Sequence, residues 1–552
     1  MNRSTRHPAL AIAGLALVVV VSAAPSAAAA PFRRADFNQD GRHDVADAVS
    51  VLEYLFLAGG GEPTCLDAGD ANDDGELDIA DALSSLGFLF LGSAAPAAPY
   101  PECGVDPTAD SLDCDAHRAC AVANLSERVG HCGGVPGTAY PNSLAPGDDL
   151  HRVTLAEPVA VCNDGSPAVF YIRAAAPDSP AADRWVFYLQ GGGGCGSFSD
   201  CLDRWCGRQS AVYDESKMSS RYCPDSIGGT GIFRRGAIGD TENAFGDFNQ
   251  VFLYYCSSDS WSGRNSDAVL TDPEDPELRY SLHFRGHDIV RATIAALLAD
   301  SVVSDDGVVA MPSLADADFA LVTGFSAGSS GVATNGDWVA SRLEPQGTVV
   351  RLVRDSAFAP PAENHPDPIE AQRLATILRA ESTLAWNTRN SSELYDAFVD
   401  ESGRAALEGS AEEWRLADKS YISHNHITTP TFVRMDLLDR PTLERYAEYG
   451  VDPRDLAILI ETTLREVPLI ATRAVEAAAI ARPGGSFGTL CGDHVGLMSD
   501  GSFFTRLVDD DSGTPRSYHE TLVRWLQGTT VTVVDDPSAR STVCGGQVTE
   551  NE

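Results

Sequence analysis

The stretch Phe319-Ala320-Leu321-Val322-Thr323-Gly324-Phe325-Ser326-Ala327-Gly328 decides the fold prediction for this chain. It opens with an apolar run typical of a buried strand, and a helix-permissive stretch, Ser329 to Ala340, follows it. Between strand and helix lies Gly-x-Ser-x-Gly, in which a sharp turn lifts the serine hydroxyl clear of the sheet edge. This order of strand, turn and helix predicts that Ser326 is a nucleophile.

Short apolar runs recur on both sides of this motif, and most are spaced widely enough for a helix between them. Such spacing favours a mostly parallel sheet. We therefore predict an α/β-hydrolase fold with a mostly parallel central sheet, preceded by a small helical module. The predicted strands are Trp185–Leu189, Val251–Tyr255, Phe319–Val322, Val349–Val353 and Thr431–Val433.

The composition is strongly acidic, with 79 Asp and Glu against 40 Lys and Arg and a formal charge of −39. This balance disfavours binding to nucleic acid or to an anionic membrane surface. It also argues mildly against tight capture of a polyanionic substrate. A soluble extracellular protein fits such a charge.

The N-terminus has the pattern of a signal peptide. Arg3 and Arg6 precede an apolar stretch from Ala9 to Val21, and the small residues from Ser22 to Ala30 offer cleavage sites. An uncleaved membrane anchor is the alternative. Thirteen cysteines in an exported chain predict disulfides, and their odd number requires at least one free or intermolecularly paired thiol.

Two acidic loops form an internal repeat. The pattern Asp-x-Asn-x-Asp-Gly-x-x-Asp-x-x-Asp begins at Asp36 and again at Asp70, 34 residues later. Oxygen side chains at loop positions 1, 3, 5, 9 and 12, with glycine at position 6, match the ligand spacing of a seven-coordinate calcium ion. Amphipathic helices are predicted after each loop, over Val45–Phe56 and Ile79–Phe90. The predicted calcium ligands are Asp36, Asn38, Asp40, Asp44, Asp47, Asp70, Asn72, Asp74, Asp78 and Asp81.

These loop–helix units, with aspartate at position 12, resemble dockerin modules. The resemblance implies structural Ca²⁺ and a helical face for a cohesin-like or cell-surface partner. The predicted organisation is a signal peptide at 1–30, the dockerin-like module at 31–94, a Cys-, Pro- and Gly-rich linker at 95–147 and the hydrolase domain at 148–552.

A serine nucleophile needs a base and an acid that orients the base. In α/β-hydrolases the acid and then the histidine follow the serine along the chain. His494, in a glycine-flanked loop, is the predicted base, whereas His519 opens a predicted helix and is expected on the solvated surface. Asp355, Asp436 and Asp439 each follow a predicted strand, so periodicity alone leaves all three open as the acid.

The run Gln190-Gly191-Gly192-Gly193-Gly194-Cys195 comes directly after the strand Trp185–Leu189. Consecutive glycines let backbone N–H groups face a ligand without obstruction by a Cβ atom. We predict an oxyanion hole formed by the amides of Gly192, Gly193 and Ala327. A merely flexible glycine loop is the plain alternative.

Several blocks of sequence resemble, in order, the pectin acetylesterase family, which includes animal Notum-type carboxylesterases. They are Val161–Pro167, the glycine run, Tyr255-Cys256-Ser257-Ser258-Asp259-Ser260-Trp261-Ser262-Gly263, Phe284–Gly286, the Ser326 motif and Asp493-His494. The resemblance spans about residues 150–530 and implies a Ser–Asp–His triad that hydrolyses carboxylic esters without a catalytic cofactor. It assigns the nucleophile to Ser326, the base to His494 and the acid to Asp439.

The resulting expectation is a secreted serine carboxylesterase that deacetylates polysaccharide through an acyl-enzyme. Two alternatives stand beside it. One is a Notum-like or lipase-like deacylase of longer acyl esters, and the other is a calcium-dependent surface-binding protein with an inactive hydrolase domain.

Overall fold

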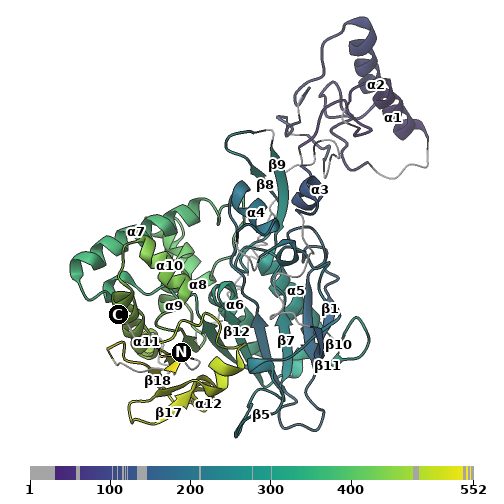
Figure 1. Cartoon of the computed structure of the whole chain (residues 1–552). Helices are drawn as coiled ribbons and strands as arrows, with labels where there is room; N and C mark the ends of the chain where they lie inside the picture. The colour runs from purple at the N-terminus through teal and green to yellow at the C-terminus, as the bar shows by residue number, and fades with distance from the viewer. Residues whose placement is uncertain are drawn as a thin grey trace, which may run out of the picture. The chain divides into compact units, whose positions relative to one another are not determined.

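The computed structural model divides the chain into two compact units, Met1–Val122 and Ala123–Glu552, each described here by itself (Figure 1). The predicted signal peptide, residues 1–30, lies outside the described residues. Those residues are 31–40, 42–57, 63–101, 103–108, 110–114, 117, 120, 122–132, 146–209, 213–276, 278–299, 301–476, 484–538, 543–544 and 547–548.

Two helices, α1 (Val45–Phe56) and α2 (Ile79–Leu86), dominate the first unit and pack against each other. Each begins with a capping box, Asp44 with Asp47 and Asp78 with Asp81, which satisfies N–H groups of the first turn. The second helix continues as a π-turn, η1 (Gly87–Leu91). Both predicted helices are thus confirmed, and a small apolar core lies between them around Phe37, Ala48, Val51 and Ala82.

The first unit extends beyond the predicted module boundary at residue 94. Disulfides Cys65–Cys114 and Cys103–Cys120 hold the following segment to the repeats. Buried Arg34 donates to the carboxylate of Asp106 at 2.9 Å. Residues 95–120, predicted as part of a linker, therefore belong to this unit, because disulfides and an ion pair whose partners cannot be read from composition anchor them.

A ten-stranded sheet forms the centre of the second unit, in the order β18-β15-β14-β13-β12-β3-β7-β2-β1-β4. The strands from β18 to β7 are all parallel, and β2, β1 and β4 add an antiparallel edge. The prediction of a mostly parallel sheet is confirmed. The strands are β1 (Pro146–Thr154), β2 (Val169–Arg173), β3 (Arg184–Leu189), β4 (Ser226–Ile227), β7 (Asn249–Leu253), β12 (Phe319–Phe325), β13 (Val349–Asp355), β14 (Thr431–Arg434), β15 (Gly485–Gly488) and β18 (Val531–Val534).

Helices cover this sheet, and short hairpins lie outside it. Helix α6 packs on β12, β13 and β3, while α11 and α12 pack on β15 and β18. The helices are α3 (Leu125–Val129), α4 (Phe198–Trp205), α5 (Gly286–Ala299), α6 (Ala327–Leu343), α7 (Pro368–Asn387), α8 (Glu401–Leu407), α9 (Lys419–Asn425), α10 (Arg440–Glu448), α11 (Pro453–Glu476) and α12 (Tyr518–Leu526). Short 3₁₀ turns are η2 (Glu215–Lys217), η3 (Gly231–Phe233), η4 (Leu314–Asp316), η5 (Glu344–Gln346), η6 (Ala362–Asn364) and η7 (Glu413–Ala417), and η8 (Gly501–Thr505) is a π-turn. The hairpins pair β5 (Ala237–Ile238) with β6 (Thr241–Glu242), β8 (Asn265–Thr271) with β9 (Arg279–Phe284), β10 (Val302–Val303) with β11 (Ala310–Met311), β16 (Leu507–Asp509) with β17 (Pro515–Ser517) and β19 (Val543–Cys544) with β20 (Gln547–Val548).

The parallel register brings the carboxyl ends of five strands to one edge of the sheet. Leu189 of β3 pairs with Gly324 of β12, and Phe325 pairs with Asp355 of β13. Asp355 in turn pairs with Arg434 of β14, and Arg434 with Phe487 of β15. The glycine run, the Ser326 motif and the loops that follow β13, β14 and β15 therefore all start at the same edge, where open α/β sheets bind ligands.

The glycines of the Ser326 motif are required by close backbone approach. A Cβ on Gly324 would strike the carbonyl of Gly328, and a Cβ on Gly328 would strike the carbonyl of Leu189 in β3. Any larger residue would separate β12 from α6 or from β3.

Replacing Gly328 by alanine is therefore expected to lower the free energy of unfolding by about 2–3 kcal/mol, as overpacking of a tight interior does. Urea unfolding measures the loss. The control is Ala340→Gly in the same helix, which removes a methyl group instead of adding one. Gly347→Ala is unsuitable as a control, because the φ of +100° at Gly347 would itself be strained with an alanine side chain. Equal stability of Gly328→Ala and the wild type would contradict the close packing described here.

Candidate active site

Ser326 occupies the sharp turn between β12 and α6. Its φ of 54° lies in the left-handed region, which is strained for a residue with a side chain. The Ser326 amide donates to the carbonyl of Asp355 at 3.0 Å, and the Ser326 carbonyl accepts from the amide of Ser330 at 3.1 Å. The turn is thus fixed by hydrogen bonds on both sides, as the motif predicts.

His494 and Asp439 meet beside this turn. A hydrogen bond of 2.7 Å joins Nδ1 of His494 to Oδ1 of Asp439. Asp439 caps α10, where its Oδ2 accepts from the amide and hydroxyl of Thr442 at 3.2 and 2.6 Å. The carboxylate is fully buried, the imidazole is 24% exposed, and its ring lies edge-on to Phe325. Such a fixed, partly exposed imidazole has the geometry of an oriented general base.

The electrostatics favour a charged carboxylate at Asp439. Burial alone would raise the pKa of Asp439, but the hydrogen bonds from His494 and Thr442 hold that pKa below its ordinary value. The aspartate therefore stays ionised at neutral pH and stabilises positive charge on the histidine.

The two other candidate acids hold the histidine loop instead of the histidine ring. Asp355 Oδ2 accepts from the amides of Gly496 and Leu497 at 2.9 and 2.6 Å. Asp436 accepts from the hydroxyl of Thr489 at 2.6 Å and from the amide of Asp493 at 2.9 Å. The sequence correctly placed the three aspartates at or just after strand ends, but only the structure separates the residue that contacts His494 from the two that contact the backbone of its loop.

Arg434 connects these two buried carboxylates. Its guanidinium lies 3.1 Å from Asp355 Oδ1 and 2.7 Å from Asp436 Oδ1, and it also donates to the carbonyl of Asp493. Burial would lower the pKa of Arg434, but Asp436 and Asp355 hold it above its ordinary value. The sequence analysis missed this residue, although its position at the end of a predicted strand, two residues before Asp436, was visible.

Replacing Arg434 by methionine is expected to lower the free energy of unfolding by about 3–5 kcal/mol, because two buried carboxylates lose their shared counter-charge. Denaturant unfolding measures this. Arg208→Met is the matched control, since its ion pair with Asp203 is about half exposed on both sides and such pairs contribute little. An Arg434→Met protein as stable as the control would show that this charge network does not hold the site.

The glycine run packs directly on the nucleophile turn. A Cβ on Gly191 would lie 2.9 Å from Cβ of Ser326, so only glycine fits there. Gly192 and Gly193 follow with φ of +148° and +63°. Among the described residues, no partner accepts a hydrogen bond from the amides of Gly192, Gly193 or Ala327. None of these three residues is among those that line the cavity described below.

The block around Asp259 holds the glycine run in place. Buried Asp259 accepts hydrogen bonds from the amides of Trp261, Gly263 and Gly286, while burial raises its pKa to about 6. The indole N–H of Trp261 donates to the carbonyl of Gln190 at 3.0 Å. This distinctive block is therefore a scaffold for the loop beside Ser326.

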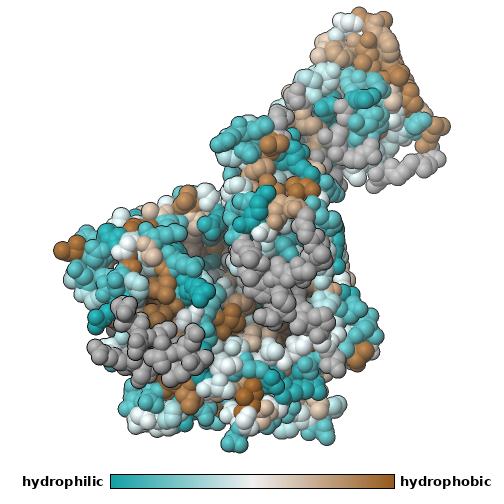
Figure 2. Space-filling model, in the orientation of Figure 1, coloured by the Kyte–Doolittle hydropathy of each residue, from teal (hydrophilic) through white to brown (hydrophobic). Residues whose placement is uncertain are grey.

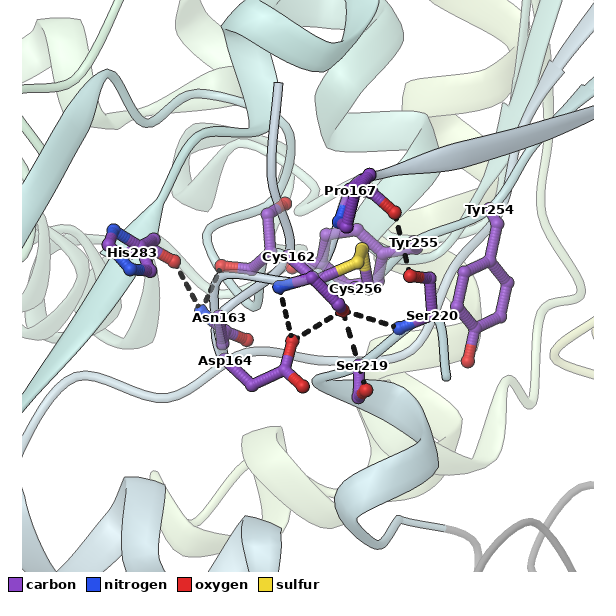
Figure 3. Close-up of a disulfide and its surroundings, with 12 residues drawn as sticks. Cys162, Asn163, Asp164, Pro167, Ser219, Ser220, Tyr254, Tyr255, Cys256 and His283 are labelled. Carbon is purple, nitrogen blue, oxygen red and sulfur yellow. Dashed lines mark hydrogen bonds between the residues drawn. A yellow bond between two sulfur atoms is a disulfide. The ribbon is translucent and has the colours of Figure 1, made fainter. Parts of the chain in front are cut away.

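Disulfides fix the neighbouring loops. Cys162–Cys256 joins the 162–167 loop to the chain just after β7, and Figure 3 shows it beside the hydrogen bond from Asn163 to the carbonyl of His283. Cys195–Cys201 closes the glycine run onto α4. The prediction of disulfides beside these segments is confirmed, and Cys223 is a buried free thiol.

A cavity of about 1120 Å³ opens beside the nucleophile and the base, and both Ser326 and His494 line it. Its walls combine aromatic and aliphatic side chains with several charged ones. The apolar members include Phe358, Leu378, Trp414, Tyr421 and Tyr446, and the charged members are Glu363, Arg379, Arg415, Asp418, Lys419, Arg445 and Glu466. The cavity is large enough for a sugar residue or for an extended acyl chain.

Lys419 is an unusual wall residue. It is the first residue of α9, and burial together with nearby Arg354 lowers its pKa to about 8. No pattern in the sequence pointed to this lysine, because the fold brings α7, α9 and α11 together only in three dimensions.

His519 is not a surface residue, so that part of the prediction is wrong. It is 5% exposed, packs against Phe503 and Phe504, and its Nε2 accepts from the amide of Ala244. The amphipathic start of α12 turns it inward onto η8. It does not line the cavity that contains Ser326.

The acidic loops of the first unit repeat one another closely. The amide of Asp40 donates to Asp36 Oδ1 at 3.0 Å, and in the second loop Asp74 donates to Asp70 Oδ1 at 3.2 Å. At position 12, the buried carboxylate of Asp47 accepts from the amides of Asn38 and Asp44, and that of Asp81 accepts from Asn72 and Asp78. Four buried carboxylates in two all-oxygen loops are a donor set that fits Ca²⁺.

Comparisons with known proteins match the part of the second unit that contains the glycine run and Ser326. Residues 147–365 match the family model described as Pectinacetylesterase. The chain is 33% identical over 222 residues to human palmitoleoyl-protein carboxylesterase NOTUM, covering 40% of this chain and 38% of that protein. It is 32% identical over 213 residues to the Drosophila melanogaster protein, with 38% and 28% covered. The solved structure of the Wnt deacylase Notum from Drosophila aligns with a TM-score of 0.47 and 25% identity, covering 69% of this chain and 94% of that one.

The matched range has clear limits. The chain spans about two fifths of the length of the human, mouse and frog relatives. The family match contains the glycine run and Ser326 but ends before Asp439 and His494, whose meeting rests on the structure alone. Over residues 147–365, the chain carries a pectinacetylesterase-family domain.

Proposed function

We propose that the second unit is a serine carboxylesterase with Ser326 as nucleophile, His494 as base and Asp439 as acid. One observation carries the proposal: the 2.7 Å bond between His494 and Asp439 lies in the loops beside the Ser326 turn, and His494 and Ser326 line one cavity. The three residues are far apart in sequence, so the fold has to bring them together.

The reaction follows from these positions. His494 takes the proton of the Ser326 hydroxyl as Oγ attacks the ester carbonyl, and the amides of Gly192, Gly193 and Ala327 stabilise the oxyanion. The protonated His494 then gives its proton to the departing alkoxide. Water, deprotonated by His494, hydrolyses the acyl-enzyme and restores the serine. No cofactor takes part in these steps.

Acetylated polysaccharide is the substrate class we favour. The cavity walls carry Arg379, Arg445 and Glu363, groups that hydrogen-bond the hydroxyls of a sugar but are poor neighbours for a bare hydrocarbon chain. Trp414 and Tyr421 also line the cavity, where the guanidinium of Arg415 lies over both rings.

A longer acyl ester is the second candidate. The relatives named palmitoleoyl-protein carboxylesterases, together with a cavity of about 1120 Å³, favour it. An acetyl group alone would leave most of that volume to the alcohol part of the substrate.

Hydrolysis of p-nitrophenyl esters from acetate to decanoate distinguishes the two. We expect the highest kcat/KM on acetate, followed by acetate release from acetylated glycans. An optimum at octanoate or longer would instead establish the long-chain deacylase. No hydrolysis of any ester by folded wild-type protein would contradict the esterase and leave the binding-protein alternative.

Export from the cell is part of the proposal. Disulfides at Cys162–Cys256 and Cys195–Cys201 form in oxidising compartments, and the predicted signal peptide would direct the chain there. Within the described residues, no helix is both long and apolar enough to cross a membrane.

The first unit is proposed as a calcium-binding, dockerin-like module. Its two helices expose apolar residues at equivalent positions of the two repeats, and Figure 2 shows apolar surface over α1 and α2. A cohesin-like or cell-surface protein would bind there. The exposed pairs are Val45 and Ile79, Val49 and Leu83, Phe56 and Phe90, and Leu57 and Leu91.

Removal of calcium with EGTA is expected to lower the melting temperature of the first unit, because buried Asp47 and Asp81 then repel the other loop carboxylates. Differential scanning calorimetry with and without calcium measures the shift. Ester hydrolysis should stay unchanged, since the site in the second unit uses no metal. A first unit equally stable in EGTA would contradict the calcium loops.

A further inference from the structure

Three carboxylates outside the predicted calcium ligands converge in the first unit. One oxygen each of Asp67, Asp106 and Asp110 lies within 4.8 Å of the other two. Asp67 follows Cys65 in the connection between the repeats, whereas Asp106 and Asp110 belong to the segment after the repeats. The disulfides Cys65–Cys114 and Cys103–Cys120 lie close in sequence to all three and hold both segments in place.

Asp67 is the unusual member of the cluster. It is only 3% exposed, and its Oδ1 is buried with no hydrogen-bond partner among the described residues. Buried carboxylate oxygens are nearly always paired, because an unpaired one loses its hydration without compensation. We take the unpaired oxygen as a sign that a ligand binds between the three carboxylates.

The positive charge nearby does not balance the cluster. Arg34 contacts Asp106, but through Oδ1, the oxygen to which Thr108 also donates. The same guanidinium nitrogen contacts Asp73 at 2.8 Å. One arginine is thus shared among several carboxylates, and no charge compensation beyond that of Arg34 acts on Asp67 within the described residues.

We propose that Asp67, Asp106 and Asp110 bind a divalent cation at a third site, which adjoins the second loop because oxygens of Asp70 and Asp73 also lie within 4.8 Å of Asp110. Three carboxylate oxygens within 4.8 Å of one another place a central ion no more than about 2.8 Å from each, so a small inward shift brings all three to about 2.4 Å, the usual Ca²⁺–oxygen distance. Calcium is therefore the cation we assign. Bound there, it links the connection between the repeats to the segment that follows them.

A bound proton is the competing explanation. Burial, together with Asp106 and Asp110, raises the pKa of Asp67 to about 7, and a protonated Asp67 would donate to Asp106. The two explanations differ in calcium stoichiometry, which does not depend on the esterase activity.

Native mass spectrometry of the full mature chain, purified in EGTA and then titrated with CaCl₂, counts the bound ions. We expect Asp67→Asn to bind one calcium ion fewer than the wild type. Asp110→Asn, at an exposed position that tolerates substitution, is expected to lose one ion as well. Glu53→Gln, an exposed carboxylate on α1, is the charge-matched control and should lose none.

Combination with a loop variant separates this site from the loops. Asp36→Asn removes a ligand of the first loop, so Asp36→Asn with Asp67→Asn should lose two ions if the sites are independent. Wild-type stoichiometry in both Asp67→Asn and Asp110→Asn would overturn the proposal and favour the proton. A third result is that the wild type binds a single calcium ion. If Asp67→Asn loses that ion and Asp36→Asn keeps it, the third site is supported and calcium binding by the two loops is contradicted.

Discussion

Replacing Ser326 by alanine is expected to lower kcat/KM for ester hydrolysis by about 10⁴–10⁶-fold, with the protein still folded. The side chain contributes the attacking oxygen, whereas the fixed turn depends on backbone hydrogen bonds of Ser326 to Asp355 and Ser330. Alanine preserves those backbone bonds. Purified variant and wild type are compared on p-nitrophenyl acetate, with circular dichroism to confirm the fold.

The control for this prediction is Ser341→Ala. Ser341 lies exposed near the end of α6, where its hydroxyl bonds only to the carbonyl of Trp338. Its activity should equal that of the wild type. Residual activity in Ser326→Ala above about one hundredth of the wild-type value would mean that another group is the nucleophile.

Asp439→Asn is expected to lower kcat by about 10⁴-fold, the second largest effect. Asparagine fits the same space, but its amide N–H₂ would face Nδ1 of His494 and favour the tautomer that cannot accept the serine proton. Since Asp439 does not reach the cavity wall, KM should change little. Steady-state kinetics with a separate determination of kcat and KM measures this.

The matched variants are Asp355→Asn and Asp436→Asn. Both carboxylates contact Arg434 and the backbone of the histidine loop, so these changes should lower stability more than they lower kcat of the folded enzyme. The opposite pattern would show that another aspartate is the acid of the triad. In that case Asp439→Asn keeps a near-normal kcat, and Asp355→Asn or Asp436→Asn loses most of its kcat without a change in melting temperature.

The lowered pKa of Asp439 also predicts an acid-side effect. A carboxylate whose folded-state pKa is depressed stabilises the protein above its unfolded pKa, about 4, and that contribution disappears as the pH falls through the folded value. The wild type should therefore lose its stability advantage over Asp439→Asn below about pH 4.

Local sequence signals predicted most of the fold. Apolar runs marked β3, β12, β13 and β14 to the residue at one end and within one to three residues at the other, because buried parallel strands are continuous and short. The helix after the first acidic loop was predicted with its observed bounds, Val45–Phe56, because its apolar residues recur at helical spacing. These features depend on neighbours in sequence, which a single chain displays.

Features that depend on tertiary contacts were not predicted from periodicity. Asp355, Asp436 and Asp439 have the same local setting, and only the family resemblance chose the residue that contacts His494. His519 was misplaced because a histidine at a helix start gives no sign of the aromatic residues that η8 packs around it. The segment after residue 94 has a linker composition, yet disulfides bind it to the first unit.

Covalent labelling tests the central claim most directly. An alkyl fluorophosphonate reacts with a serine only when a neighbouring base activates it, and peptide mass spectrometry locates the adduct. The structure predicts a single adduct on Ser326, absent in Ser326→Ala and formed far more slowly in His494→Ala. An adduct on another serine, or none on a preparation that hydrolyses esters, would contradict the assignment of Ser326 as the nucleophile.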